Sequence, residues 1–228
     1  MKKSFYKDYW DKNLVNWTNQ YINLTRKNEE NFRTNFFVNF LYKIIIYNLE
    51  RKATKNRLKI VQKFLEEHKS IKKVLNDIGA GNGFVTKKFI KKFKIINYID
   101  FSKEAINSLK KIKGSKKIYY IDMIKQQMPR SDLAICAGVT PCIEKKFQIK
   151  FLNNIVSNTK IALIHYLDKN NFFNFVRIII PTLNVRKVNV YSKDFLDNYY
   201  KKRKFILKKR IYFGTGFCDI ISKYNIKI

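Results

Sequence analysis

Cysteine, proline and glycine are scarce in this chain of 228 residues. It has 3 Cys, 3 Pro and 7 Gly. Three cysteines are an odd number and show no paired metal-ligand spacing, which disfavours both a disulfide framework and a zinc site. We therefore expect no metal and reduced thiols in a cytoplasmic compartment. The few glycines and prolines give no sign of a flexible linker between domains.

Long apolar runs are missing as well. No run approaches the ~20 residues that a membrane-spanning helix needs. Residues 1–30 are polar and charged and lack the apolar centre of a secretory leader. Because 46% of the residues are hydrophobic, the chain can still fill one complete core. We expect a soluble intracellular α/β domain with an N-terminal helical extension.

Acidic residues are few compared with basic ones. The chain has 48 Lys+Arg and 17 Asp+Glu, a formal net charge of +31. Lysines and arginines gather at 87–94 and 201–210, where they could contact nucleic acid or an anionic membrane surface. The alternative is a solvated basic surface, since the richness in Lys, Asn, Ile, Tyr and Phe is typical of adenine- and thymine-biased coding. That bias leaves the low acid count unexplained.

The stretch VLNDIGAGNG, residues 74–83, carries the clearest motif. An apolar strand runs into Asp77 and is followed by glycines at three alternate positions. Apolar residues at helical spacing after Gly83 predict that a helix begins there and continues through Ile90. Glycines between a strand and a helix allow a sharp turn and a close approach of a ligand to the backbone. The sequence therefore predicts a loop that holds a polar or charged cofactor.

The spacing of the glycines separates three kinds of cofactor loop. A nucleoside triphosphatase loop ends in Gly-Lys-Ser/Thr, whereas Gly83 is followed by Phe84 and Val85. A dinucleotide loop reads G-x-G-x-x-G, whereas this loop reads G-x-G-x-G. Asp77 would repel a pyrophosphate but attract a cation, such as the sulfonium and ammonium of S-adenosylmethionine. The loop resembles the first motif of the class I S-adenosylmethionine-dependent methyltransferases.

Further segments follow at the spacing of that family. Residues 95–100 read as a strand ending in an acid, 118–121 as a strand followed by Asp122, and 132–137 as a fourth strand. The resemblance implies that Asp100 accepts ribose hydroxyls, that Asp122 accepts the adenine amine and that Met123 packs on the ring. The cofactor contacts that it implies are Asp77, Gly79, Ala80, Gly81, Gly83, Asp100, Phe101, Asp122, Met123, Ala137 and Gly138.

The resemblance also implies the architecture. We expect an α/β, Rossmann-like, seven-stranded, mostly parallel sheet with an antiparallel last strand, formed by residues 70–228. Residues 1–69 would form an N-terminal helical extension or lid. Aromatic residues between 5 and 17 suit either a lid or core packing. Residues 204–212 and 217–224 would pair as the final hairpin.

The methyl acceptor is less sharply indicated. Methyltransferases that act on nucleic-acid bases carry Asp/Asn-Pro-Pro-aromatic after the fourth strand, and this chain has AGVTP at 137–141. We therefore expect O- or C-methylation of a small molecule, aromatic or lipid-like. An RNA methyltransferase and a non-catalytic scaffold are the alternatives. The oligomeric state stays open.

Three residues are candidates for acting on the acceptor. His165, near the end of the fifth strand, is the candidate general base because histidine titrates near neutrality. The alternative for His165 is a hydrogen-bonded structural histidine. Tyr166 and Arg177 are candidate acceptor contacts, because they combine an aromatic surface with a cation.

Overall fold

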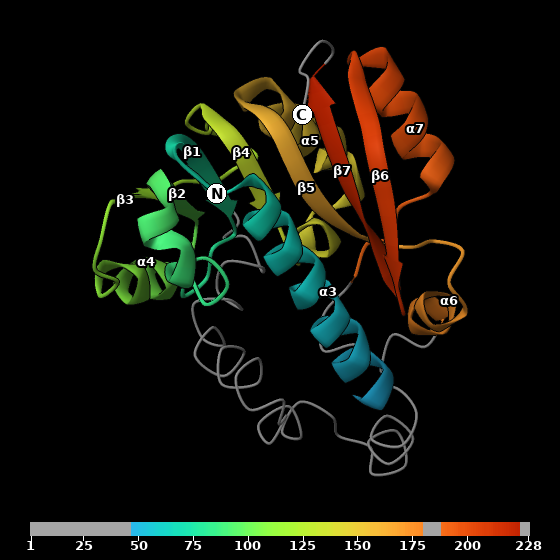
Figure 1. The fold of residues 1–228 in the computed structure, drawn as a ribbon. Coiled ribbons are helices and arrows are strands. Elements are labelled where there is room, and N and C mark those ends of the chain that lie inside the picture. Colours follow the sequence, from blue (N-terminus) through green and yellow to red (C-terminus); the bar gives the residue numbers. More distant parts are fainter. Residues whose placement is uncertain (1–46, 180–187, 224–228) are drawn as a thin grey trace.

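The computed structural model describes residues 47–179 and 188–223 (Figure 1). Their backbone forms one seven-stranded sheet in the order β3-β2-β1-β4-β5-β7-β6. The strands are β1 (Ser70–Ile78), β2 (Phe93–Asp100), β3 (Lys116–Tyr120), β4 (Ser131–Cys136), β5 (Thr159–Leu167), β6 (Phe205–Phe213) and β7 (Gly216–Lys223). The aromatic residues at 5–17, which suit either a lid or core packing, lie outside the described residues.

The sheet is parallel except at its last strand. Strands β1 to β5 pair in parallel, and β7 runs antiparallel to both β5 and β6. Strand β6 therefore runs in the same direction as β5, and β7, the last described strand, lies between them. The Rossmann-like sheet with an antiparallel last strand, expected from the sequence, is confirmed.

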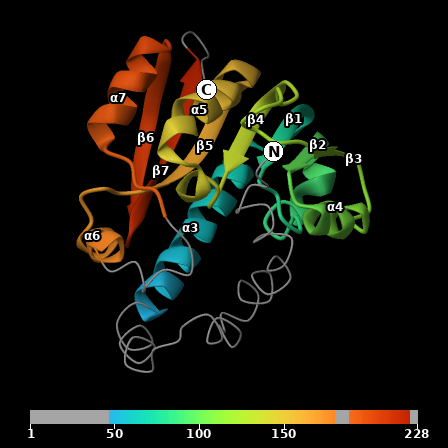
Figure 2. The ribbon, with the colours of Figure 1, turned by 180° about the vertical axis from the view of Figure 1, so that it is seen from behind.

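Helices cover both faces of the sheet (Figures 1 and 2). The α-helices are α3 (Tyr47–His68), α4 (Lys103–Lys110), α5 (Gln148–Asn158), α6 (Phe172–Ile179) and α7 (Lys193–Lys202). Three short 3-10 helices are η3 (Lys87–Lys92), η4 (Thr140–Cys142) and η5 (Lys145–Phe147). Among the described helices, none is long and apolar enough to cross a membrane.

Alternation along the strands divides the core into two halves. Leu133 and Leu163 point to the face that α3 and α4 cover, where Val61, Phe64 and Leu65 of α3 are at most 1% exposed. Ala134 and Ile164 point to the other face and pack with α5 and α7. Each large buried side chain contributes about 1.5–3 kcal/mol of transfer free energy. Helix α3 is thus part of the core, and the boundary expected between residues 69 and 70 stays a prediction.

The prediction of a helix that begins at Gly83 is wrong in both the extent and the type of helix. Turns follow the glycine loop, and only the six residues of η3 are helical before β2 begins at Phe93. Phe89 and Ile90 are buried as the apolar spacing predicts. A 3-10 helix rises about 2.0 Å per residue, against about 1.5 Å in an α-helix. The 3-10 helix therefore covers the distance from the glycine loop to the start of β2 in fewer residues than an α-helix would need.

Candidate functional site

The carboxyl ends of the parallel strands meet at one edge of the sheet, called here the carboxyl edge. Open α/β sheets bind their ligands at this edge. It brings together Asp77 at the end of β1, Asp100 at the end of β2, and the segment that follows β4. Residues far apart in the sequence thus surround one location, as the motif order predicts.

The glycine loop adopts a backbone that side chains disfavour. Gly79, Gly81 and Gly83 have φ of 66°, 57° and 68°. A Cβ atom on Gly79 would lie 2.1 Å from Cγ2 of Val139, so the loop packs directly against the segment after β4. The backbone N–H of Gly79 donates to the carbonyl oxygen of Ile99 at 2.8 Å, which fixes the loop to the end of β2.

Asp100 links the loop to the helix that follows β2. Its Oδ2 accepts a hydrogen bond from the N–H of Gly81 at 2.9 Å, and its Oδ1 accepts one from the N–H of Ser102 at 2.9 Å. The side chain of Ser102 in turn caps α4. A carboxylate oxygen is a suitable acceptor for hydroxyl donors such as those of a ribose.

Asp77 is a buried acid beneath the loop. It is 7% exposed, and its Oδ2 accepts a hydrogen bond from Oγ1 of Thr86 at 2.5 Å. Burial raises the pKa of Asp77 to about 7; the hydrogen bond from Thr86 opposes this rise, and the charge of Asp100 adds to it. A cation placed beside Asp77 would favour its ionised form. The residue therefore fits a positively charged group.

The expected adenine-binding residues differ in how much surface they offer. The Asp122 side chain is 39% exposed, accepts from the N–H of Ile124 at 3.0 Å and lies 3.5 Å from Nζ of Lys125. Phe101 is half-buried. Met123 is 4% exposed and packs into the core on the α5 face. Asp122 and Phe101 thus offer surface to a ligand, whereas the side chain of Met123 points mainly inward.

The segment after β4 meets β5 and α3 at Gly138, beside Ala137, which is also half-buried. The N–H of Gly138 donates to Nδ1 of His165 at 3.1 Å. A Cβ atom on Gly138 would lie 3.4 Å from Nη1 of Arg57, which comes from α3. The sequence reasoning missed Arg57. No local motif marks it, because its position depends on where α3 crosses the sheet.

His165 is enclosed. It is 1% exposed, and burial together with the charge of Arg57 lowers its pKa well below the usual value. Because Nδ1 accepts from Gly138, the proton of the neutral ring lies on Nε2, which is buried without a hydrogen-bond partner. Neither nitrogen can take a proton from an acceptor in this arrangement. The geometry favours the structural alternative, and the general-base role stays a prediction without geometric support.

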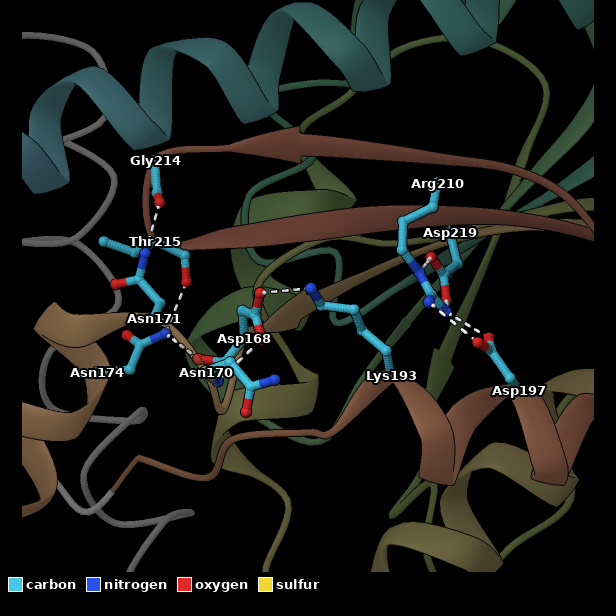
Figure 3. A network of polar contacts seen from close by, with 10 residues as sticks. All are labelled: Asp168, Asn170, Asn171, Asn174, Lys193, Asp197, Arg210, Gly214, Thr215 and Asp219. Carbon is cyan, nitrogen blue, oxygen red and sulfur yellow. Dashed lines mark hydrogen bonds and ion pairs between the residues drawn. The ribbon is translucent and has the colours of Figure 1, made fainter.

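Tyr166 faces the opposite side of the sheet from His165. It is 0% exposed, and its hydroxyl lies 2.8 Å from that of Tyr200, which donates to Oδ2 of Asp219 at 3.2 Å. Asp219 is paired with Arg210, whose Nε lies 2.7 Å from its Oδ1 (Figure 3). Tyr166 therefore has no surface for an acceptor, because alternation along β5 turns it into the core. Arg177 lies on α6, and its side chain is outside the described residues.

Helix α6 is tied to the carboxyl edge by two asparagines (Figure 3). Nδ2 of Asn174 donates to the carbonyl oxygens of Asp168 at 2.7 Å and Thr215 at 2.6 Å. Nδ2 of Asn171 donates to the carbonyl oxygen of Gly214 at 2.9 Å. The helix consequently lies beside the β6–β7 turn (Figure 1). Its exposed face carries Phe172 (68% exposed), Phe175 (55%) and Ile178 (49%).

Three solved structures show what this fold is similar to. A magnesium protoporphyrin IX methyltransferase from Synechocystis PCC 6803 with bound S-adenosylhomocysteine aligns with a TM-score of 0.70 and 11% identity, over 95% of this chain and 97% of that chain. The N-methyltransferase NodS from Bradyrhizobium japonicum WM9, also with S-adenosylhomocysteine, gives 0.59 and 12%, over 78% and 97%. The small RNA methyltransferase HEN1 gives 0.60 and 13%, over 75% and 26%.

No protein-family model and no curated protein matches the sequence itself. The structural likenesses, at these identities, concern the fold. The described chain has the fold of the class I S-adenosylmethionine-dependent methyltransferases, and its glycine loop and strand-end acids stand at the carboxyl edge of that fold. Within the described residues, no three His, Cys, Asp or Glu side chains form a group that could hold a metal ion.

Proposed function

We propose that this protein is an S-adenosylmethionine-dependent methyltransferase acting on a small-molecule acceptor. The observation that carries the proposal is the pair of strand-end acids. Asp77 lies buried below the glycine loop, and Asp100 binds the N–H of Gly81 from its side. A cationic cofactor with a ribose matches both, since one acid suits the cation and the other can accept hydroxyl bonds.

Different residues around the loop contact different parts of the cofactor. Asp77 balances the positive charge of the methionine portion. Asp100 accepts hydrogen bonds from the ribose hydroxyls, and Asp122 accepts one from the adenine amine beside Phe101. Gly79, Ala80, Gly81 and Gly83 supply the backbone surface, and Ala137 and Gly138 border the methionine end. The bound cofactor supplies the methyl group on a sulfonium. The chain then has to align a nucleophile with that sulfonium, which requires no side-chain base when the acceptor is already nucleophilic.

Helix α6 supports an acceptor with an apolar portion. Its exposed Phe172 and Phe175 lie on an element that the Asn171 and Asn174 bonds hold at the carboxyl edge. Aromatic side chains bury a large apolar area when a ring or lipid chain packs on them. We propose that such an acceptor is methylated at oxygen or carbon, with Arg177 of the same helix as a candidate partner for an acidic group. The similar magnesium protoporphyrin IX methyltransferase acts by name on a small molecule, which supports a small-molecule acceptor, whereas the N-methyltransferase NodS does not bear on oxygen or carbon as the methylated atom.

The alternatives make different demands. An RNA methyltransferase needs its RNA at the carboxyl edge. The similarity to HEN1, a small RNA methyltransferase, is the observation that favours this alternative. A non-catalytic scaffold needs no cofactor. Cofactor binding and acceptor turnover therefore separate the three.

Calorimetric titration with S-adenosylmethionine and S-adenosylhomocysteine tests the cofactor, with NAD as the negative control. We expect micromolar binding of both, and a loss of at least tenfold in Asp100→Asn. The matched control is Asp132→Asn, because Asp132 also accepts a backbone N–H, that of Val74 at 2.9 Å, but lies at the start of β4 on the opposite edge. Absence of binding to either methionine cofactor would support the scaffold.

A further inference from the structure

The edge opposite the candidate cofactor site is built from exposed basic residues. Here β1 to β6 begin and β7 ends, and we call it the basic edge; it is the upper edge in Figure 1. Two runs that are more than a hundred residues apart in the sequence, 91–94 and 201–204, both lie on it. Its exposed basic residues are Lys69, Lys72, Lys91, Lys92, Lys94, Lys110, Lys111, Lys113, Lys117, Arg130, Lys160, Lys201, Lys202, Arg203 and Lys204.

Few acids balance this charge. Among the described residues, the acids at the basic edge are Glu66, Glu67 and Asp132. Asp132 is 2.7 Å from Nζ of Lys160, and Glu66 is paired with Lys69. The hydrogen bond from Lys69, with the charges of Lys92 and Lys88, lowers the pKa of Glu66. Lysines from different elements thus converge on a single carboxylate, and their charge greatly exceeds that of the acids.

At the carboxyl edge, several surface lysines are paired with acids. Lys125 pairs with Asp122, Lys146 with Glu144, and Lys193 with Asp168. Among the described residues, fifteen exposed basic residues and three acids thus lie at the basic edge, whereas several lysines at the carboxyl edge have an acid beside them. A concentrated field of one sign raises the local concentration of oppositely charged partners.

The shape of the basic edge suits a linear polyanion. Seven strands about 4.8 Å apart make a row roughly 29 Å long, which corresponds to roughly eight base pairs at about 3.4 Å each. Among the described residues, Ile71 is the one large apolar side chain well exposed at this edge, at 72%. A surface that enters a membrane usually adds several apolar anchors to its cations, whereas binding to a phosphate backbone requires only the cations.

We propose that the basic edge binds the phosphate backbone of a nucleic acid, without reading its sequence. The nine residues of β1 or β5 span about 30 Å at about 3.3 Å each, so a strand bound at this edge lies that far from the glycine loop. The segment bound at the basic edge therefore does not reach the glycine loop and is not itself the methyl acceptor. This binding site is independent of the proposed methyltransferase activity.

Fluorescence anisotropy with a labelled 20-nucleotide single-stranded RNA of mixed sequence tests the proposal, with a 20-base-pair DNA duplex as the second probe. The variant Lys72→Gln/Lys94→Gln/Lys117→Gln removes three exposed charges from β1, β2 and β3 at the basic edge. The matched control Lys87→Gln/Lys145→Gln/Lys169→Gln removes three exposed charges from the carboxyl side. Both triples change the net charge equally, so they separate position from total charge.

We expect the wild type to bind with an affinity that falls steeply between 50 and 300 mM salt. The basic-edge triple should lose at least tenfold in affinity at 100 mM salt, and its slope of log affinity against log salt should fall by roughly 2, since each phosphate contact contributes about 0.7–0.9. The control triple should stay within threefold of the wild type. Binding to RNA alone or to both probes identifies the preferred backbone.

Three results would overturn the proposal. They are an absence of binding to both probes at 50 mM salt, an equal loss in the two triples, and preferential binding to phosphatidylcholine/phosphatidylserine vesicles that neither nucleic acid displaces. The basic-edge triple should also bind S-adenosylmethionine as the wild type does. Failure of the cofactor titration and failure of the nucleic-acid titration are therefore separate outcomes.

Discussion

The two edges of the sheet differ in the sign and the burial of their charged residues. At the carboxyl edge two key acids are buried and hydrogen-bonded, with Asp77 accepting from Thr86 and Asp100 from Gly81 and Ser102. At the basic edge the lysines are numerous and exposed. A buried, bonded group depends strongly on its surroundings, whereas an exposed charge contributes little alone. Single substitutions should therefore matter at the first edge, and only grouped substitutions at the second.

The largest effect should follow a change in the glycine loop. Gly79→Ala places a Cβ atom 2.1 Å from Cγ2 of Val139 and forces a residue with a side chain to φ 66°. We expect a loss of about 2–5 kcal/mol in unfolding free energy and at least a hundredfold weaker cofactor binding, from overpacking and backbone strain. Urea unfolding and calorimetry measure the two. Adding Val139→Ala should restore part of the stability, and no restoration would contradict the clash.

The second effect concerns the buried acid and pH. Because burial raises the pKa of Asp77 from 3.8 to about 7, the native state holds a proton that the unfolded state has released between those values. Stability of the cofactor-free protein should therefore fall as pH rises from about 4 to about 7, by on the order of 4 kcal/mol at about 1.4 kcal/mol per pKa unit.

Asp77→Asn isolates this contribution. The neutral amide keeps an acceptor for Thr86 but cannot ionise, so the difference in unfolding free energy between variant and wild type should grow from pH 5 to pH 8, with the variant more stable at pH 8. Cofactor affinity should fall at the same time, since the balancing charge is gone. Parallel pH profiles for the two proteins would rule out a titrating Asp77.

A smaller effect separates the two roles considered for His165. His165→Asn keeps an acceptor near the N–H of Gly138, while His165→Leu leaves that N–H unsatisfied at a cost of about 1–3 kcal/mol. If His165 only positions Gly138, the Asn variant should retain most of the methyl-transfer rate and an unchanged pH profile. Loss of the rate in both variants, with a pH-dependent limb removed, would restore the general-base hypothesis.

The smallest effect should come from neutralising the basic edge. In the triple Lys72→Gln/Lys94→Gln/Lys117→Gln, we expect stability to change by less than about 0.5 kcal/mol per site, with a slight net gain at low salt because like charges repel. Thermal unfolding at 20 and 300 mM salt measures this. A loss of several kcal/mol would mean that these lysines hold the fold.

Much of the fold follows from local sequence patterns. Apolar runs and the final hairpin predict strands that the structure confirms, such as β2, β4 and the β6–β7 pair, within a residue or two. Ser192, whose side chain accepts from the N–H of Phe195, caps the start of α7 in the same local way. These features depend on neighbours in the chain, which a single sequence displays directly.

Features that depend on packing between distant elements were harder to predict. The sequence places His165 and Tyr166 together near the end of β5, but the sheet turns them to opposite faces and buries both. Arg57 reaches Gly138 only because α3 crosses the sheet there. The convergence of 91–94 and 201–204 at one edge likewise needs the strand order. Spacing along the chain cannot supply these positions.

The position of β7 has a consequence for how the chain folds. The final strand sits between β5 and β6, so β6 has no sheet partner among the described strands until β7 arrives. During synthesis, β1 to β5 can pair before β7 has been made. Until then, the backbone N–H and C=O groups of β6 and of the free edge of β5 have no strand partner. Closure of the sheet therefore has to follow the synthesis of β7. A nascent chain stalled before residue 216 should be prone to aggregation through these two open edges.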